Sequence, residues 1–182
     1  MMNILKNKLK ILWMNFMKYE LKELNIDMNQ DVYEMYQDIP NGENGQENKC
    51  YGISFDKYKE YLKKEIERKD NDVTYDDTPC ITYIMYVNNY PVGFICLRTK
   101  IDENWKKWSG NCYYSIRSSE RKKGYATKML SLALEKFKEL NFESIYIQSS
   151  DGNIGSAKVI GNNYGIFLRE VEGTRYYKIL IK

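Results

Sequence analysis

The feature that most constrains this chain is a short strand, a basic turn and a long amphipathic helix that follow one another between residues 112 and 140. The turn reads Arg-Lys-Lys-Gly-Tyr-Ala at 121–126, and the helix is expected from about Lys122 to Leu140. A turn that leads onto a helix N-terminus leaves several backbone N–H groups without intrahelical partners, and these converge with the positive end of the helix dipole. Gly124 allows unusual backbone angles and the close approach of a ligand. The pattern predicts a polyphosphate site.

Two commoner phosphate motifs are absent from this turn. It contains neither Gly-x-x-x-x-Gly-Lys-Ser/Thr nor Gly-x-Gly-x-x-Gly. Taken alone, the six residues fit equally well a basic turn that simply begins a solvated helix. The order of the elements around the turn is needed to decide between the two interpretations.

The turn resembles the Arg/Gln-x-x-Gly-x-Gly/Ala loop of the GNAT superfamily of N-acetyltransferases, and the likeness continues beyond it. A strand, the turn, a long helix, a second strand and an Asn-led helix follow in the order of that family from about Gly110 to Gly165. Tyr-Ser-Ile-Arg-x-Ser-x-Arg at 114–121 and Asn-x-x-Ser-x-Lys-Val-Ile at 153–160 are similar to motifs of a bacterial subgroup of predicted acetyltransferases. With the segment Asp38-Ile-Pro-Asn-Gly-Glu-Asn-Gly, the resemblance spans roughly residues 17 to 182.

Hydrophobic periodicity and turn residues predict strands and helices that alternate along the chain. Strands are expected over 19–25, 81–87, 92–99, 112–117, 145–147, 166–171 and 176–181, and helices over 29–37, 56–69, 122–140 and 154–162. The crossover from strand 112–117 through the long helix to strand 145–147 should be parallel and right-handed. The resemblance implies an α/β fold of the α+β type, with a mixed, mostly antiparallel twisted sheet flanked by helices. In that fold the central parallel strand pair splays apart around the cofactor.

The length of 182 residues predicts one domain with a single core, which we assign to residues 17–182. Residues 1–16 carry three lysines and no acid, with apolar residues at near-helical spacing, and therefore predict an appended amphipathic helix. This helix could lie on a membrane surface, pack on the domain or contact a second subunit in a homodimer. Alternatively, Met17 could be the natural start.

The composition restricts the chemistry. The absence of histidine excludes Ser-His-Asp and Cys-His nucleophile systems. The four cysteines are scattered without a Cys-x-x-Cys pair, so no metal is expected, and reduced thiols fit a cytoplasmic protein. The net charge is +3 and the basic residues cluster near one helix end, which argues against nucleic-acid binding. No integral membrane segment is expected.

The resemblance implies three contacts with acetyl-coenzyme A (acetyl-CoA). The turn would bind the pyrophosphate largely through backbone N–H groups, a strand edge would pair with the amides of the pantetheine arm, and the Asn-led helix would reach the same arm. The residues implied are Arg121, Lys122, Lys123, Gly124, Tyr125, Ala126 and Thr127 for the pyrophosphate, Ile116, Arg117 and Ser118 for the arm, and Asn153 with Ser156 at the helix start. Asn153 could also act only as a helix cap.

The implied catalytic groups are less complete. A backbone amide near Tyr114 would stabilise the oxyanion of the tetrahedral intermediate and lower the activation barrier by about 3 kcal/mol. Many relatives carry a tyrosine seven residues beyond the helix-leading Asn, where this chain has Ile160, and Asn111 replaces a histidine of the subgroup. Glu103 is the candidate base that removes the proton of the amine, although most such acids are simply exposed.

The expected function is transfer of an acetyl group from acetyl-CoA to a primary amine of a small molecule or peptide, by direct attack in a ternary complex. The alternative is a non-catalytic acyl-CoA binding or regulatory module, because Ile160 and Asn111 stand where relatives present ionisable groups. The residues alone do not identify the acceptor amine.

Overall fold

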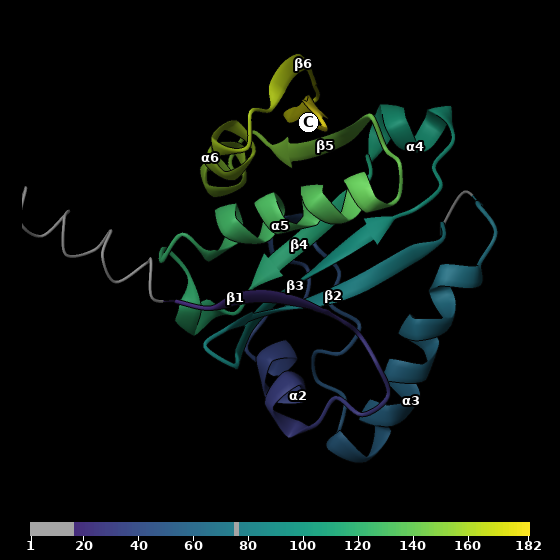
Figure 1. Ribbon diagram of the computed structural model, residues 1–182, viewed down its shortest axis with the longest axis vertical. Helices are drawn as coiled ribbons and strands as arrows, with labels where there is room; N and C mark the ends of the chain where they lie inside the picture. Colours follow the sequence, from purple (N-terminus) through teal and green to yellow (C-terminus); the bar gives the residue numbers. More distant parts are fainter. Residues whose placement is uncertain (1–16, 75–76) are drawn as a thin grey trace, which may run out of the picture.

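The computed structural model describes residues 17–74 and 77–182 and contains two antiparallel sheets (Figure 1). The expected helix over residues 1–16 lies outside the described residues. The first sheet, sheet A, has the order β1-β2-β3-β4, and the second, sheet B, has the order β5-β7-β6. The strands of sheet A are β1 (Tyr19–Glu23), β2 (Cys80–Val87), β3 (Tyr90–Arg98) and β4 (Cys112–Ile116), and those of sheet B are β5 (Ser144–Ser150), β6 (Ile166–Val171) and β7 (Thr174–Leu180).

Helices cover both faces of sheet A (Figure 1). Helices α2 (Gln30–Gln37) and α3 (Phe55–Glu67) lie on one face, and α5 (Tyr125–Glu139) lies on the other, between sheet A and sheet B. The shorter helices are α4 (Glu103–Trp108) and α6 (Ile154–Asn162). Among the described residues no helix combines the length and the apolar character needed to cross a membrane.

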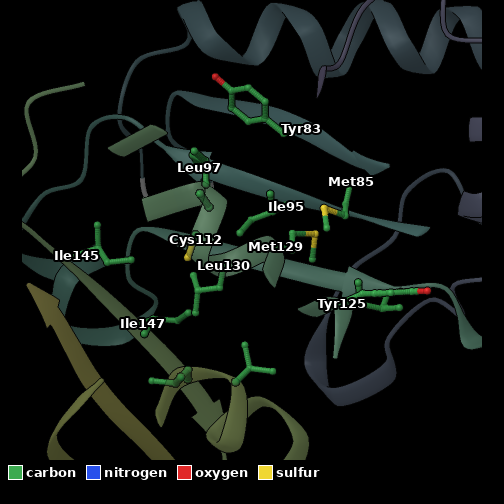
Figure 2. Close-up of a cluster of buried hydrophobic side chains, with 14 of the residues drawn as sticks. Tyr83, Met85, Ile95, Leu97, Cys112, Tyr125, Met129, Leu130, Ile145 and Ile147 are labelled. Carbon is green, nitrogen blue, oxygen red and sulfur yellow. The ribbon is translucent and has the colours of Figure 1, made fainter. Parts of the chain in front are cut away.

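Alternation along the strands of sheet A produces two cores, one on each face, where the length of the chain had predicted a single core. On the α5 side, Met85, Ile95 and Leu97 pack against Met129 and Leu130, together with Ile145 and Ile147 of β5 (Figure 2). On the opposite side, side chains of α2 and α3 pack against the sheet; the fully buried ones include Val32, Met35, Tyr36, Leu62 and Ile84. β4 is an edge strand of sheet A, and it lies between the two helix layers.

The predicted α+β class, with antiparallel strands flanked by helices, is confirmed. The predicted helix start at Lys122 was too early, because Lys122 and Gly124 adopt left-handed backbone angles, with φ of 62° and 89°, and α5 begins at Tyr125. The short helix α4 was missed, although Asp102 provides a capping carboxylate that accepts a hydrogen bond from the Trp105 N–H at 2.9 Å.

The expected central pair, β4 and β5, belongs to two different sheets. Their arrows point the same way in Figure 1, but the strands are joined only at one end. There Asn111 donates its N–H to the Tyr146 carbonyl at 2.6 Å, and its Oδ1 accepts the Tyr146 N–H at 2.8 Å. An isolated bridge between Gly110 and Ile147 lies beside this contact. Beyond it the two strands diverge.

We predict that Asn111→Ala lowers the free energy of unfolding by about 1–3 kcal/mol, because it leaves the Tyr146 N–H without its acceptor next to a buried position. Asn111 is only 2% exposed, so water cannot easily replace the lost bond. Urea denaturation at neutral pH measures the change. Asn162→Ala, at an exposed position of α6, is the control and should stay within about 0.5 kcal/mol. Equal losses in both variants would contradict the assigned role.

Candidate active site

A cleft of about 1100 Å³ opens where β4 and β5 diverge. It is lined by β4, by β5 from Ile147 to Ser150, by the starts of α5 and α6, and by the loop 43–49. It also touches both cores of sheet A, because Tyr36 from the α2 side and Tyr125 from the α5 side both line it. The cleft therefore passes around the open edge of β4 from one face of the sheet to the other.

The turn before α5 presents a row of free amides to this cleft. Gly124 is the residue before the helix, has a φ of 89° and offers no side-chain cap. Within the described residues, the backbone N–H groups of residues 122–127 donate to no carbonyl or side chain. A Cβ built on Gly124 would meet nothing within 4 Å, so space is open above the turn. Free amides at a helix N-terminus with open space around them fit a phosphate group.

The outer edge of β4 provides further unpaired backbone groups. Arg117 donates its N–H to Val92 of β3 at 2.9 Å, and successive residues of a strand direct their backbone groups to opposite edges. Tyr114 and Ile116 therefore direct their amides away from β3, toward the cleft. This edge can pair with an extended chain that carries amides of its own.

Helix α6 closes the cleft from the β5 side. Asn153 is its N-cap, and its side-chain oxygen accepts the Ser156 N–H at 3.0 Å. Across the gap, the hydroxyls of Tyr114 and Ser156 lie 3.0 Å apart. Burial raises the pKa of Tyr114 well above its ordinary value, so its hydroxyl keeps its proton at neutral pH.

Comparison with known proteins identifies this architecture. The model of the acetyltransferase (GNAT) family matches residues 30–164. The chain belongs to the GNAT family of acetyltransferases. It is an acetyltransferase, and acetyl-CoA is its co-substrate. The residues of the cleft fit that molecule, because the turn offers free amides for its diphosphate and β4 offers a free edge for its pantetheine arm.

Individual GNAT relatives are distant from this chain. Streptothricin acetyltransferase A of Bacillus subtilis (strain 168) is 26% identical over 129 residues, which cover 70% of each protein. The structure of the N-acetyltransferase PseH of Campylobacter jejuni with acetyl-CoA superposes with a TM-score of 0.59 at 14% identity, covering 91% of this chain and all of that one. A chimera of spermidine N-acetyltransferase SpeG from Vibrio cholerae and hSSAT gives a TM-score of 0.60 at 17% identity, covering 89% and 95%. These structural likenesses show the shared fold.

Most of the expected cofactor residues of this GNAT protein line the cleft. They are Ile116, Arg121, Lys122, Gly124, Tyr125, Ala126, Thr127, Asn153 and Ser156. Arg117, Ser118 and Lys123 do not line it. The Ser118 N–H donates to the Asp38 carbonyl at 2.9 Å, and the Lys123 ammonium donates to Glu120 at 2.7 Å. The structure therefore gives no support for cofactor contacts by the side chains of these three residues, whereas the backbone N–H of Lys123 belongs to the row of free amides.

Two acids missed by sequence reasoning hold the Gly124 turn in place. Asp38 ends α2 and accepts hydrogen bonds from the Arg117 Nε at 2.9 Å and the Ser119 hydroxyl at 2.6 Å. Glu43 binds Arg121 with both carboxylate oxygens, at 2.7 and 2.6 Å. Although burial opposes the shift, the bonds from Ser119 and Arg117 lower the pKa of Asp38, and Arg121 lowers that of Glu43. Both acids belong to the segment 38–45 on which the family resemblance partly rests, so pairing them with the nearby arginines was the available signal.

The proposed base Glu103 lies outside the cleft. Its side chain is 88% exposed and accepts a hydrogen bond from the Lys106 ammonium at 2.6 Å. It begins α4, on the far side of the β4–β5 junction, and this placement argues against a role in catalysis. Ile160 is fully buried in the core on the α5 side, so its position in this GNAT protein offers no group to the cleft.

We predict that Gly124→Val abolishes acetyl-CoA binding, because the side chain would occupy the open space over the turn and strain its left-handed backbone. Isothermal titration calorimetry should show an affinity loss of more than about 100-fold, the equivalent of about 2.7 kcal/mol. Gly52→Val is the matched control, because Gly52 has a φ of 80°, equally open surroundings and no contact with the cleft. Retained affinity in Gly124→Val, with normal circular dichroism, would count against the site.

We also predict that Asp38→Asn weakens the turn from a distance. The free energy of unfolding should fall by about 1–3 kcal/mol at pH 7, because the partly buried Arg117 loses the carboxylate that pairs with it. The folded-state pKa of Asp38 is lowered, so its contribution is complete above the unfolded value of about 3.9 and is lost as pH falls through the folded value. The difference from wild type should therefore shrink between pH 5 and about pH 2. Urea denaturation at several pH values tests this.

The control for Asp38→Asn is Asp27→Asn, which changes an exposed acid that has no ion pair with another described residue. It should alter stability by no more than about 0.5 kcal/mol at every pH. A pH-independent loss in Asp38→Asn would mean that packing, not charge, explains the effect.

Proposed function

We propose that this GNAT acetyltransferase transfers the acetyl group of acetyl-CoA to a primary amine of a small molecule or peptide, by direct attack within a ternary complex. The shape of the cleft supports this most, because it runs from the Gly124 turn past the open edge of β4 to the opposite face of sheet A. Two substrates can approach the same strand edge from opposite faces. The four free, buried cysteines are consistent with a cytoplasmic protein, and a homodimer stays a prediction.

The proposed contacts follow the free backbone groups. The amides of residues 122–127 bind the diphosphate, and the edge at Ile116 pairs with an amide of the pantetheine arm. Asn153 caps α6 and, in this proposal, also reaches that arm. The Tyr114 amide donates a hydrogen bond to the acetyl carbonyl oxygen as negative charge grows on that oxygen. This bond lowers the activation barrier by about 3 kcal/mol.

The reaction forms a bond between the amine nitrogen and the acetyl carbonyl carbon and breaks the carbon–sulfur bond. One proton leaves the nitrogen, and the sulfur takes up one proton. We assign the second transfer to the Tyr114 hydroxyl, because Ile160 leaves no hydroxyl at the place where many relatives carry a tyrosine. The Tyr114 hydroxyl lines the cleft beside Ser156 and carries a proton at neutral pH. Burial raises its pKa, which makes a lasting tyrosinate unfavourable, so in this proposal the hydroxyl takes up the proton that leaves the amine nitrogen as it gives its own to the sulfur.

The test is release of the coenzyme A thiol across a panel of primary amines, followed with a thiol reagent. Wild-type protein should release thiol with at least one amine, and Tyr114→Phe should lower kcat by about tenfold or more while leaving acetyl-CoA affinity within about threefold. The substitution keeps the ring and the backbone amide. Glu103→Gln, outside the cleft, should keep the wild-type rate. Full activity in Tyr114→Phe would show that its hydroxyl has no part in proton transfer.

A further inference from the structure

The part of the cleft on the α2 and α3 face of sheet A contains a buried charged cluster, which we call the acceptor pocket. It consists of Glu65, Arg68, Asp77, Arg98 and Tyr113. The Arg68 Nη1 donates to the Glu65 Oε2 at 3.1 Å and to the Tyr113 hydroxyl at 3.0 Å, and its Nη2 donates to Asp77 at 2.7 Å. The Arg68 and Glu65 side chains are only 15% and 10% exposed.

The acceptor pocket adjoins the reacting strand edge. Tyr113, which binds Arg68, directly precedes Tyr114 in β4, whose amide is the proposed oxyanion donor. Tyr113 packs toward the α2 and α3 core, whereas Tyr114 packs toward the α5 core. A molecule held by Arg68 and Glu65 therefore approaches β4 from the face opposite the Gly124 turn.

Several polar atoms of this pocket have no partner in the protein. Among the buried side-chain atoms without a hydrogen-bond partner in the described part of the chain are the Nε of Arg68, the Nε of Arg98 and the hydroxyl of Thr82. All three residues line the cleft. The Glu65 Oε1 also accepts no hydrogen bond from a described residue, because Arg68 binds only Oε2. Such groups cost free energy unless something pairs with them, so their presence indicates a polar ligand.

The carboxylates of the cleft each have an ion-pair partner, although Glu65 and Asp77 share the single charge of Arg68. Each of the five acids that line it forms an ion pair: Glu43 with Arg121, Glu47 with Lys49, Glu65 and Asp77 with Arg68, and Glu120 with Lys123. Six basic residues line the same cleft, and Arg98, Lys122 and Lys158 have no ion pair with another described residue. An amine with several positive charges would find no unpaired carboxylate here, and additional cations would be repelled.

From this charge balance we infer that the acceptor is a small zwitterion, an amine that carries its own carboxylate. This inference rests on the proposed function. Its ammonium group binds the Glu65 Oε1, and its carboxylate accepts hydrogen bonds from the guanidinium groups of Arg68 and Arg98. Arg98 is suited to this because it is held rigidly, with its guanidinium 4.8 Å from the Trp105 ring and 4.9 Å from the Tyr113 ring and its Nη1 bonded to the Gly110 carbonyl.

The test compares amines that differ only by a carboxylate. L-lysine is cadaverine with an added carboxylate, and L-ornithine is putrescine with the same addition. Wild-type protein should use the amino acid of each pair with a kcat/KM at least about tenfold above that of the diamine, a preference that charge complementarity can supply. A preference for the diamines would overturn the inference and leave the proposed function intact. No thiol release with any amine, while acetyl-CoA still binds, would contradict the proposed function and the inference with it.

Two charge variants separate recognition from structure. Arg68→Gln leaves Glu65 and Asp77 unpaired, so the preference should shift toward the diamines by at least about tenfold. Glu65→Gln removes a negative charge and should shift it toward the amino acids. Glu67→Gln, an exposed acid on the same helix, should leave the ratio unchanged. Calorimetry with acetyl-CoA checks that each variant is folded. Because Glu65→Gln retains the Arg68–Asp77 pair, it tests the proposal even if Arg68→Gln does not fold. Shifts in the same direction would contradict the assignment.

Discussion

The two hydrogen bonds between Asn111 and Tyr146 are the constraint on which the rest of the molecule depends. They join β4 to β5 at one end, and beyond them the strands separate into different sheets. If the two strands continued to pair, the edge of β4 would be used up in a ladder and no cleft would exist. At this junction the Asn111 side chain accepts the Tyr146 N–H and the Asn111 backbone N–H donates to the Tyr146 carbonyl, while the amides of Tyr114 and Ile116 stay free.

The Gly124 turn depends on contacts with residues that are far away in the sequence. Asp38 and Glu43, at the end of α2 and in the loop that follows, hold Arg117, just after β4, and Arg121, at the start of the turn. The family resemblance assigned Arg121 to the pyrophosphate and Arg117 to the pantetheine arm. In the structure their side chains are used to position the backbone, and the amides remain as the groups that face the cleft. The basic side chains of Arg117 and Arg121 therefore act by holding the backbone of this turn in place.

The sequence predicted the parts of the fold that local pattern controls. The bounds of α6 and β6 were predicted correctly, and the Gly124 turn was placed correctly before the long helix. The family resemblance implied that β4 and β5 diverge, but periodicity could not reveal where they stay joined, because that junction is a contact between Asn111 and Tyr146, 35 residues apart. Glu103 was chosen as a carboxylate within a segment similar to the bacterial subgroup, and only the tertiary structure shows that it begins α4 outside the cleft. The acceptor pocket was also missed, since α3 reads as a charged surface helix, and burial of Glu65 follows from its packing against sheet A.

The left-handed backbone of the Gly124 turn and the ion pairs beside it depend on one another. A left-handed φ of 62° at Lys122 costs about 1–3 kcal/mol in a residue that has a Cβ, and it is maintained only if the surroundings determine it. The Arg121–Glu43 pair fixes the chain on one side of Lys122, and α5 fixes it on the other. Because the amides are held in this arrangement without a ligand, the diphosphate binding that we propose would require little further ordering of the turn. The left-handed backbone lowers the free energy of unfolding, and in the proposed function the ordered amides raise the affinity for the cofactor. Asp38 and Glu43 hold the turn in this conformation through their ion pairs.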